Sequence, residues 1–268
     1  MIHLRSVEYL RFKANTHDEY PFNTKLAKGF EKLIFDSTIT LFVGENGSGK
    51  STLLEAIAAA IGAITAGSES VEFDEEFEAV RNLAKCFKLI WSFKNKKGFF
   101  LRAEDYISYT KKLSQIRSDM KKAIDEVDDT YAGKSNYTKN LAKMPYVGSL
   151  NEMKSMYNGN LEDRSHGESY LTFFKARLKP GVLYLLDEPE TPLSPMNQLT
   201  FIALIKEMVE QDCQFIIATH SPIIMAYPNA SIYDFDELPL QQVNYNDLEH
   251  VRFMKAFLND PERYLRHL

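Results

Sequence analysis

The stretch Gly44-Glu45-Asn46-Gly47-Ser48-Gly49-Lys50-Ser51-Thr52 decides the fold. It fits the pattern of a glycine, four residues of any kind, then Gly-Lys-Ser. Glycines at these positions let backbone amides turn towards phosphate groups, the lysine reaches the β- and γ-phosphates, and the next hydroxyl ligates Mg²⁺. We therefore predict that this stretch binds the phosphates of ATP, and that Ser51 is one ligand of a Mg²⁺ ion.

The residues around this stretch have the pattern that such a loop requires. The run 38–43 is β-branched and apolar, as in a strand, and 53–61 is rich in strong helix formers. Further along, 182–186 and 214–219 are continuous apolar runs, typical of strands buried in a parallel sheet, and 198–210 between them has helical spacing. This alternation predicts an α/β fold of the P-loop NTPase class.

Polar residues follow both later strands. Asp187 and Glu188 end the first, and His220 follows the second. Strand ends of a parallel sheet line one crevice, so we expect these side chains near the phosphates. We predict that Asp187 holds Mg²⁺, directly or through water, that Glu188 polarises the attacking water, and that His220 stabilises charge at the γ-phosphate.

Other segments give weaker expectations. We predict strands at 87–93 and 99–103 joined as a hairpin through 94–98, and a charged helix over 104–130. The polar residues 131–160 are expected to be mobile, and 68–80 to form a surface loop or short helix. We expect strand-like alternation over 3–12 and an edge strand at 231–235.

Composition limits the class of protein. The 268 residues are 44% hydrophobic with a net charge of −5, and no run is long enough to span a bilayer. The N-terminus lacks the features of a signal peptide, and the two cysteines are too far apart in sequence to suggest a metal motif. We expect a cytoplasmic protein. Residues 81–160 hold sixteen Lys and Arg against eight Asp and Glu, which indicates either a face for nucleic acid or an acidic partner, or simply a solvated helical arm.

The order of phosphate loop, Asp-Glu strand and histidine resembles ABC-type ATPases, specifically the soluble SMC/RecF-like branch. That class has a Ser-Gly-Gly-Glu/Gln signature before a helix, and this chain has Ser165-His166-Gly167-Glu168, with His166 in place of the usual glycine. The resemblance implies that Ser165 and the Gly167 amide bind the γ-phosphate held by the other subunit of a homodimer. The residues 191–195 differ from the Ser-Ala-Leu-Asp typical of transporters.

A closer likeness covers nearly the whole chain and is weakest over 105–160. The chain is similar to a family of small stand-alone bacterial predicted ATPases. The likeness is carried by Tyr20-Pro21-Phe22, by 99–104, by 165–169 and by 257–265. It implies the fold and ATP binding and says little of the pathway.

Two departures from the class stand out. No glutamine occupies the Q-loop position, since Gln115 lies too deep in the charged helix, and Glu104 is a candidate to replace it. No aromatic residue is a clear partner for adenine; Phe12 and Tyr20 are candidates, and either could equally be a core residue.

These features predict one ABC-type domain over 1–268 with a helical insert at 104–164. We expect this insert to be basic and to be the part that contacts DNA or a partner protein. We expect a Mg²⁺-dependent ATPase that dimerises around ATP, acting with nucleic acid or a partner effector in repair or phage defence. Two alternatives stay open: the energising subunit of a transporter, and an ATP-gated interaction module with negligible turnover.

Overall fold

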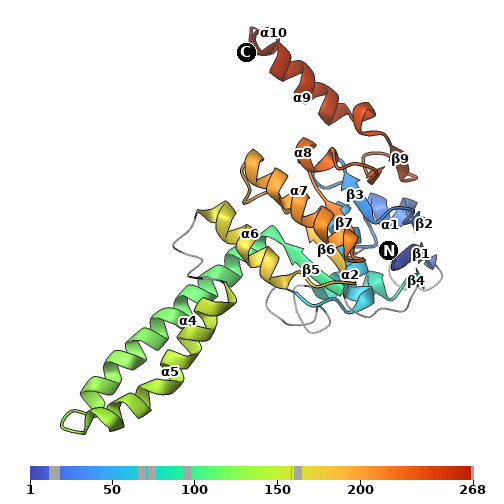
Figure 1. Ribbon diagram of the computed structural model, residues 1–268. Helices are drawn as coiled ribbons and strands as arrows, with labels where there is room; N and C mark the ends of the chain where they lie inside the picture. The colour runs from blue at the N-terminus through green and yellow to red at the C-terminus, as the bar shows by residue number, and fades with distance from the viewer. Residues whose placement is uncertain are drawn as a thin grey trace. The chain divides into compact units, whose positions relative to one another are not determined.

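The computed structural model describes residues 1–11, 19–65, 71, 77–92, 98–157, 159 and 165–266. The chain divides into two compact units: the first combines Met1–Ala103 with Lys179–Leu268, and the second is Glu104–Leu178 (Figure 1). The second unit begins where the insert was expected to begin and continues past residue 164 to the end of the following helix.

The first unit contains a six-stranded sheet with the strand order β5-β6-β7-β3-β8-β9. Neighbouring strands are parallel except for β8 and β9, which pair antiparallel. The strands are β3 (Ile39–Val43), β5 (Gly98–Arg102), β6 (Leu183–Asp187), β7 (Gln214–Ala218), β8 (Ser231–Asp234) and β9 (Gln241–Val243). The parallel order confirms the expected α/β fold class.

The central strands follow from their composition. All five residues of β3, β6 and β7 are buried, and only a parallel sheet covered on both faces accommodates such continuous apolar runs. The register pairs Asp187 with Ala218 at the carboxyl ends of β6 and β7. The residues that follow these two strands therefore emerge beside each other.

The core forms around helix α2 (Lys50–Ile61), which begins directly after the phosphate loop. Leu53, Leu54 and Ile57 of this helix are fully buried and pack with Phe42 of β3 and Phe100 of β5. The helix ends at Gly62, whose left-handed conformation (φ +64°) lets its amide bond back to the last turn. Burial of this apolar face holds the helix N-terminus against the sheet.

The first unit contains further elements besides this sheet and α2. A small antiparallel sheet has the order β2-β1-β4. Its strands are β1 (Leu4–Tyr9), β2 (Lys32–Ile34) and β4 (Phe87–Trp91); the other helices are α1 (Lys25–Gly29), α3 (Glu78–Ala84), α7 (Pro195–Glu210), α8 (Pro222–Met225), α9 (Glu249–Asn259) and α10 (Pro261–Leu265), with a 3₁₀ turn at Tyr245–Asp247.

The expected hairpin between 87–93 and 99–103 is wrong. Strand β4 pairs antiparallel with β1 in the small sheet, whereas β5 pairs parallel with β6 in the large one. Strand β4 is only partly buried and β5 is almost wholly buried, so the two runs fit different environments. Residues 94–97 of the expected turn lie outside the described residues.

One further expectation is wrong, and another, the surface loop or short helix over 68–80, agrees with the structure where its residues are described. The strand expected at the sheet edge, β8, lies inside the sheet, because the short polar strand β9 pairs with its outer side. The region 68–80 lies largely outside the described residues, and its described end, Phe77–Val80, leads into α3.

The second unit is a helical hairpin followed by a third helix: α4 (Ala103–Thr130), α5 (Asn136–Met156) and α6 (His166–Arg177). The charged helix expected over 104–130 is confirmed as α4. The Arg177 guanidinium of α6 stacks 3.8 Å above the Phe173 ring and donates to the Tyr157 hydroxyl, which bonds the Tyr109 hydroxyl of α4 at 2.8 Å. This aromatic cluster joins α6 to α4 and to the end of α5.

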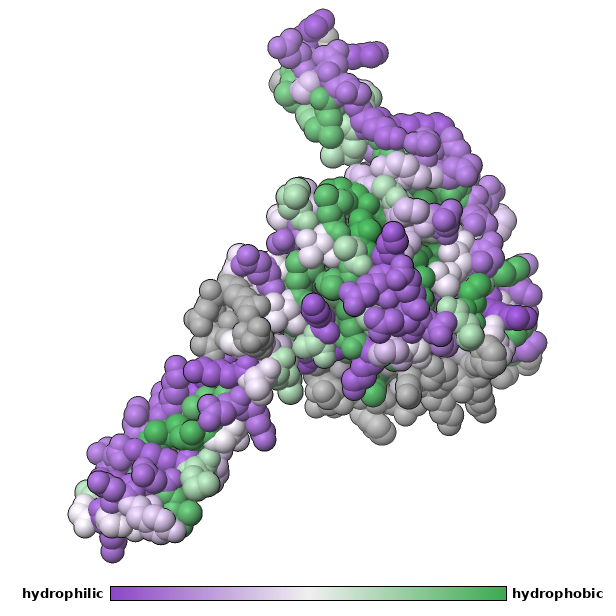
Figure 2. Space-filling view, in the orientation of Figure 1, coloured by the Kyte–Doolittle hydropathy of each residue, from purple (hydrophilic) through white to green (hydrophobic). Residues whose placement is uncertain are grey.

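The mobile segment expected over 131–160 is instead mostly helix α5. Ser135 caps it by accepting from the Thr138 amide, and Lys143 pairs with Asp128 of α4 at 2.6 Å. The internal Pro145 and the polar composition hid this helix in the sequence. Figure 2 shows this hairpin as mostly hydrophilic, with a few green, hydrophobic patches. Its exposed apolar side chains include Leu141.

The insert is also not basic. Residues 104–164 hold ten Lys and Arg and ten Asp and Glu, whereas residues 81–103 hold seven Lys and Arg and no acidic residue. The positive excess thus lies before the hairpin, in the first unit. In the described part of the chain, no helix combines the length and apolar character needed to cross a membrane.

Candidate functional site

The phosphate loop lies between β3 and α2, and its glycines are required by its backbone. Gly44, Gly47 and Gly49 have φ values of +138°, +79° and +105°, a region that residues with a Cβ rarely adopt. At Gly44 an added Cβ would also lie 2.8 Å from Oδ1 of Asp236. The loop therefore keeps its shape only with glycine at these positions.

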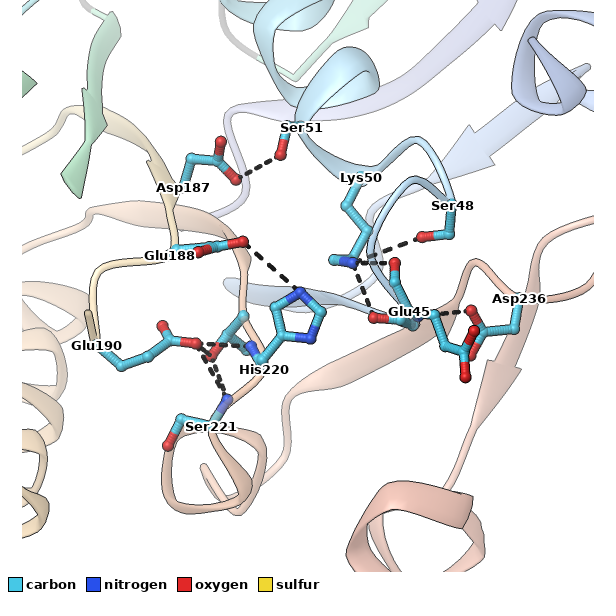
Figure 3. A network of polar contacts seen from close by, with 12 residues as sticks. Glu45, Ser48, Lys50, Ser51, Asp187, Glu188, Glu190, His220, Ser221 and Asp236 are labelled. Carbon is cyan, nitrogen blue, oxygen red and sulfur yellow. Dashed lines mark hydrogen bonds and ion pairs between the residues drawn. The ribbon is translucent and has the colours of Figure 1, made fainter. Parts of the chain in front are cut away.

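Lys50 is the first residue of α2 and is only 4% exposed. Its Nζ donates to the carbonyl oxygens of Gly44 at 2.8 Å and Glu45 at 2.7 Å, and lies 3.5 Å from Oγ of Ser48 (Figure 3). Burial lowers the pKa of the Lys50 ammonium, and the nearby carboxylates, led by Asp236, oppose this shift. The cation is thus held inside the loop, where a phosphate group can reach it.

Ser51 and Asp187 form the pair of oxygens expected to hold Mg²⁺. The Ser51 hydroxyl donates to Oδ1 of Asp187 at 3.1 Å (Figure 3). Burial raises the pKa of Asp187 to about 6, although the bond from Ser51 and the charges of Arg102 and Lys50 oppose it. A buried carboxylate beside a hydroxyl suits Mg²⁺, which prefers oxygen ligands and takes few from protein.

No cluster of three or more His, Cys, Asp or Glu suited to a metal occurs among the described residues. A Mg²⁺ ion held by one or two protein oxygens, with the rest from phosphate and water, needs no such cluster. The donor set of Ser51 and Asp187 therefore fits Mg²⁺ bound together with a nucleotide.

Glu188 and His220 lie opposite each other at the ends of β6 and β7. Oε1 of Glu188 is 3.6 Å from Nε2 of His220, and this nitrogen is buried without a hydrogen bond among the described residues (Figure 3). Burial lowers the pKa of His220, and the positive charge of Lys50 lowers it further, whereas the Glu188 carboxylate raises it. A carboxylate and an imidazole with a lowered pKa thus adjoin the phosphate loop.

The backbone at Glu188 is in the left-handed region, with φ +48°. Its amide donates to the Ala218 carbonyl at 2.9 Å, which ties the turn after β6 to the end of β7. Such a conformation costs on the order of 1 kcal/mol for a residue with a side chain.

Two cavities adjoin the phosphate loop. The larger, of about 1110 Å³, is lined by the loop, Glu188, Lys25 and Tyr20. The Tyr20 hydroxyl bonds Oγ1 of Thr52 at 3.2 Å and the side chain is 52% exposed, so Tyr20 stays a candidate for contact with adenine. The other candidate, Phe12, lies outside the described residues.

The second cavity, of about 680 Å³, lies at the other side of the loop. It is lined by Gly44–Asn46, His220 and Asp236, and by His250 and Phe253 of α9. Several carboxylates also line it, whereas Lys50 and Ser51 line the larger cavity, so the larger cavity is the better place for phosphate groups.

The signature-like segment belongs to the second unit and is described by itself. Ser165 caps α6: its Oγ accepts from the Glu168 amide, and the Glu168 carboxylate accepts from the Ser165 amide and hydroxyl. Ser165 and His166 are exposed and Gly167 is buried. Glu104, the candidate for the missing glutamine, is exposed in the first turn of α4, and its role stays a prediction.

Two acidic residues of the site escaped the sequence analysis. Asp236 follows β8, and its Oδ1 accepts from the Glu45 amide at 2.6 Å, fixing the start of the phosphate loop. Glu190 accepts three hydrogen bonds from residues 219–221. The Pro-Glu after Asp187-Glu188 was the available signal for Glu190; no local pattern indicated Asp236, which comes from another strand.

The fold and the site together define a P-loop nucleoside triphosphatase, with a phosphate loop after β3 and acidic residues at the end of β6. The sequence matches the AAA ATPase domain family over residues 81–225 and the P-loop containing region of the AAA domain over residues 22–69. The protein belongs to the AAA ATPase domain family. The expected P-loop ATPase class is confirmed.

The chain also has matches among solved structures, all at low sequence identity. It is similar to the Smc head domain bound to the C-terminal domain of ScpA from Pyrococcus furiosus (14% identity, TM-score 0.47, 97% of this chain and 99% of that one). It is also similar to a nucleotide-free ATP-binding cassette of an ABC transporter (16% identity, TM-score 0.47, 98% of this chain and 97% of that one). A third similar structure is cbiO1 from Clostridium perfringens (16% identity, TM-score 0.45, 100% of both chains). No curated protein matches the chain in sequence.

Proposed function

We propose that this protein binds Mg²⁺-ATP and hydrolyses it to ADP and phosphate. The observation that carries the proposal is the 3.6 Å approach of Glu188 to His220 beside a complete phosphate loop. A chain that only bound nucleotide would need the loop and the Ser51–Asp187 pair, but not a carboxylate and an imidazole at the phosphate end.

Each group has a role in this reaction. Lys50 offsets the charge of the β- and γ-phosphates, and a bound Mg²⁺ would neutralise the charge that develops on their oxygens. Glu188 orients and polarises the attacking water, and the buried His220 nitrogen donates to or accepts from the transferring group. Tyr20 packs beside the base.

We also propose that the site is completed by a second copy of the chain. In this proposal Ser165 and the Gly167 amide of one subunit contact the γ-phosphate bound by the other, as the resemblance to ABC-type ATPases implies. The support is that Ser165 is exposed at the N-terminus of a twelve-residue helix, where backbone amides favour an anion. Hydrolysis would then release the dimer.

The dimer would act as an ATP-dependent switch with nucleic acid or a partner effector, in repair or phage defence, in the cytoplasm. Support for this role is the resemblance to the SMC/RecF-like branch of ABC-type ATPases. The transporter alternative is disfavoured by Thr191–Pro195, which differ from the transporter pattern.

Steady-state ATPase measurements over a range of protein concentrations test this function. If the site needs two chains, the rate per chain rises with concentration and then levels off. Ser165→Ala should lower the plateau about tenfold or more, because each removed donor to a developing anion costs at least that much.

Ser135→Ala is the matched control, since Ser135 also caps a helix of the second unit but lies outside the proposed site. Both variants lose about 1 kcal/mol of capping, so only a difference in turnover reports on the phosphate contact. A rate per chain that is independent of concentration would exclude the two-chain site.

A further inference from the structure

The turn after β6 carries an acidic residue that contacts the next loop. Oε1 of Glu190 accepts from the Thr219 hydroxyl at 2.8 Å, the His220 amide at 2.6 Å and the Ser221 amide at 3.1 Å (Figure 3). One carboxylate oxygen therefore binds three consecutive residues of the loop after β7.

These donors have little access to water. Thr219 is fully buried and Ser221 is 6% exposed, so their polar groups need an acceptor within the protein. The other oxygen of Glu190, Oε2, is buried without a partner among the described residues. All of the anchoring is thus done by a single oxygen.

The surrounding hydrogen bonds make the anchored loop rigid. The Ser221 hydroxyl donates to Oε1 of Gln198 at 2.5 Å, and Gln198 in turn donates to the Leu193 carbonyl. Leu193 also donates its amide to the Glu190 carbonyl at 2.8 Å. The turn after β6 and the loop after β7 are therefore closed into one hydrogen-bonded ring.

We propose that Glu190 is a positioning residue for ATP hydrolysis, whose carboxylate fixes the backbone of His220 so that the imidazole faces Glu188. Glu190 lies two residues after Glu188 and bonds the amide of His220, so one side chain connects the turns that carry both groups. This inference rests on the proposed hydrolysis, and it assigns Glu190 no contact with substrate.

The position of the acceptor, rather than its charge, is what matters in this role. Burial raises the pKa of Glu190, against the opposing hydrogen bonds, so the negative charge is not favoured by its surroundings. A glutamine has a carbonyl oxygen at the same distance from the backbone and can accept from the same donors. An aspartate keeps the charge, but its side chain is one methylene shorter, so its carboxylate lies farther from the three donors.

The test compares Glu190→Gln with Glu190→Asp, using the exposed Glu207→Gln on α7 as a control. For Glu190→Asp we expect kcat to fall about 10- to 100-fold, as a misplaced catalytic group does, with KM for ATP within about threefold. Glu190→Gln should keep kcat within about threefold of the unaltered protein. The reverse order, or no effect of either substitution, would overturn the proposal.

A second measurement does not depend on turnover. The NMR signal of the His220 ring is recorded as a function of pH in the nucleotide-free protein. The signal is assigned to His220 because it disappears in His220→Asn. The pKa of this ring also responds in every variant to four charged or titratable neighbours: Lys50, Glu188, Asp236 and His250. Glu190→Asp should move its titration towards that of a solvated histidine, and Glu190→Gln should leave it unchanged.

The two measurements separate this proposal from the proposed function. If the unaltered protein hydrolyses no ATP, the proposed function fails and the NMR titration alone decides the role of Glu190. If Glu190→Asp leaves the titration of His220 unchanged, the positioning role fails even where hydrolysis is established.

Discussion

At the scale of single residues, the site contains a carboxylate, Asp187, whose charged form is unfavourable in the nucleotide-free protein. Asp187 is 8% exposed, and burial raises its pKa to about 6. Because the pKa in the folded state lies above the ordinary value of 3.8, protonated Asp187 stabilises the fold at low pH. That contribution is lost as the pH rises through about 6, so the charged form is a cost that a bound cation would offset.

Asp187→Asn should therefore make the nucleotide-free protein more stable at pH 7.5. A shift of about two pKa units corresponds to about 3 kcal/mol of unfolding free energy as an upper estimate, and the asparagine oxygen can still accept from Ser51. The gain should vanish near pH 4. Thermal unfolding across pH measures it, with Asp125→Asn on the exposed face of α4 as control. A variant less stable than the unaltered protein at pH 7.5 would show that the carboxylate is stabilising.

At the scale of elements, the helices and strands that could be predicted are those whose own residue pattern shows whether they are buried. Strands β3, β6 and β7 and helix α2 were predictable because continuous burial or helix propensity acts over the whole segment. The candidate site residues could be proposed from the same segments, since Lys50 begins α2, Asp187 ends β6 and His220 comes two residues after β7.

Elements whose environment depends on distant partners were not predictable. Nothing within 87–103 shows that β4 pairs with β1 while β5 pairs with β6. Helix α5 has no fully buried residue, so no apolar stripe marked it in the sequence. Asp236 reaches the phosphate loop from a strand 190 or so residues later, and only the tertiary fold brings the two together.

The charge distribution gives a prediction at the same scale. The insert that contains the hairpin of α4 and α5 has equal numbers of basic and acidic residues, and the excess of positive charge lies in 81–103. Any salt-dependent affinity for DNA should therefore come from residues 81–103. Replacing the exposed Lys85 and Lys88 with Glu should weaken binding, with a shallower dependence on salt.

The control replaces four exposed lysines of α4 with Glu: Lys111, Lys112, Lys121 and Lys122. This variant should bind DNA within about threefold of the unaltered protein, because acidic neighbours already balance these lysines. Loss of binding in this variant instead would restore the hairpin as the nucleic-acid face. No DNA binding by the unaltered protein at ~50 mM salt would favour a protein partner.

At the scale of the whole molecule, the proposed two-chain site draws its residues from both units. The phosphate loop, Asp187, Glu188 and His220 belong to the first unit, whereas Ser165 and Gly167 belong to the second. In the proposed homodimer each nucleotide would contact the first unit of one chain and the second unit of the other. A symmetric dimer of this kind contains two equal sites.

The mass of Glu188→Gln in Mg²⁺-ATP, measured by light scattering, tests this claim most directly. The substitution keeps the shape of the side chain but removes the charge that polarises water, so ATP should persist and hold two chains together. We expect the mass of a dimer with Mg²⁺-ATP, the mass of one chain without nucleotide, and one chain again when Lys50→Ala is added. A Glu188→Gln variant that binds Mg²⁺-ATP and keeps the mass of a single chain would contradict the two-chain site.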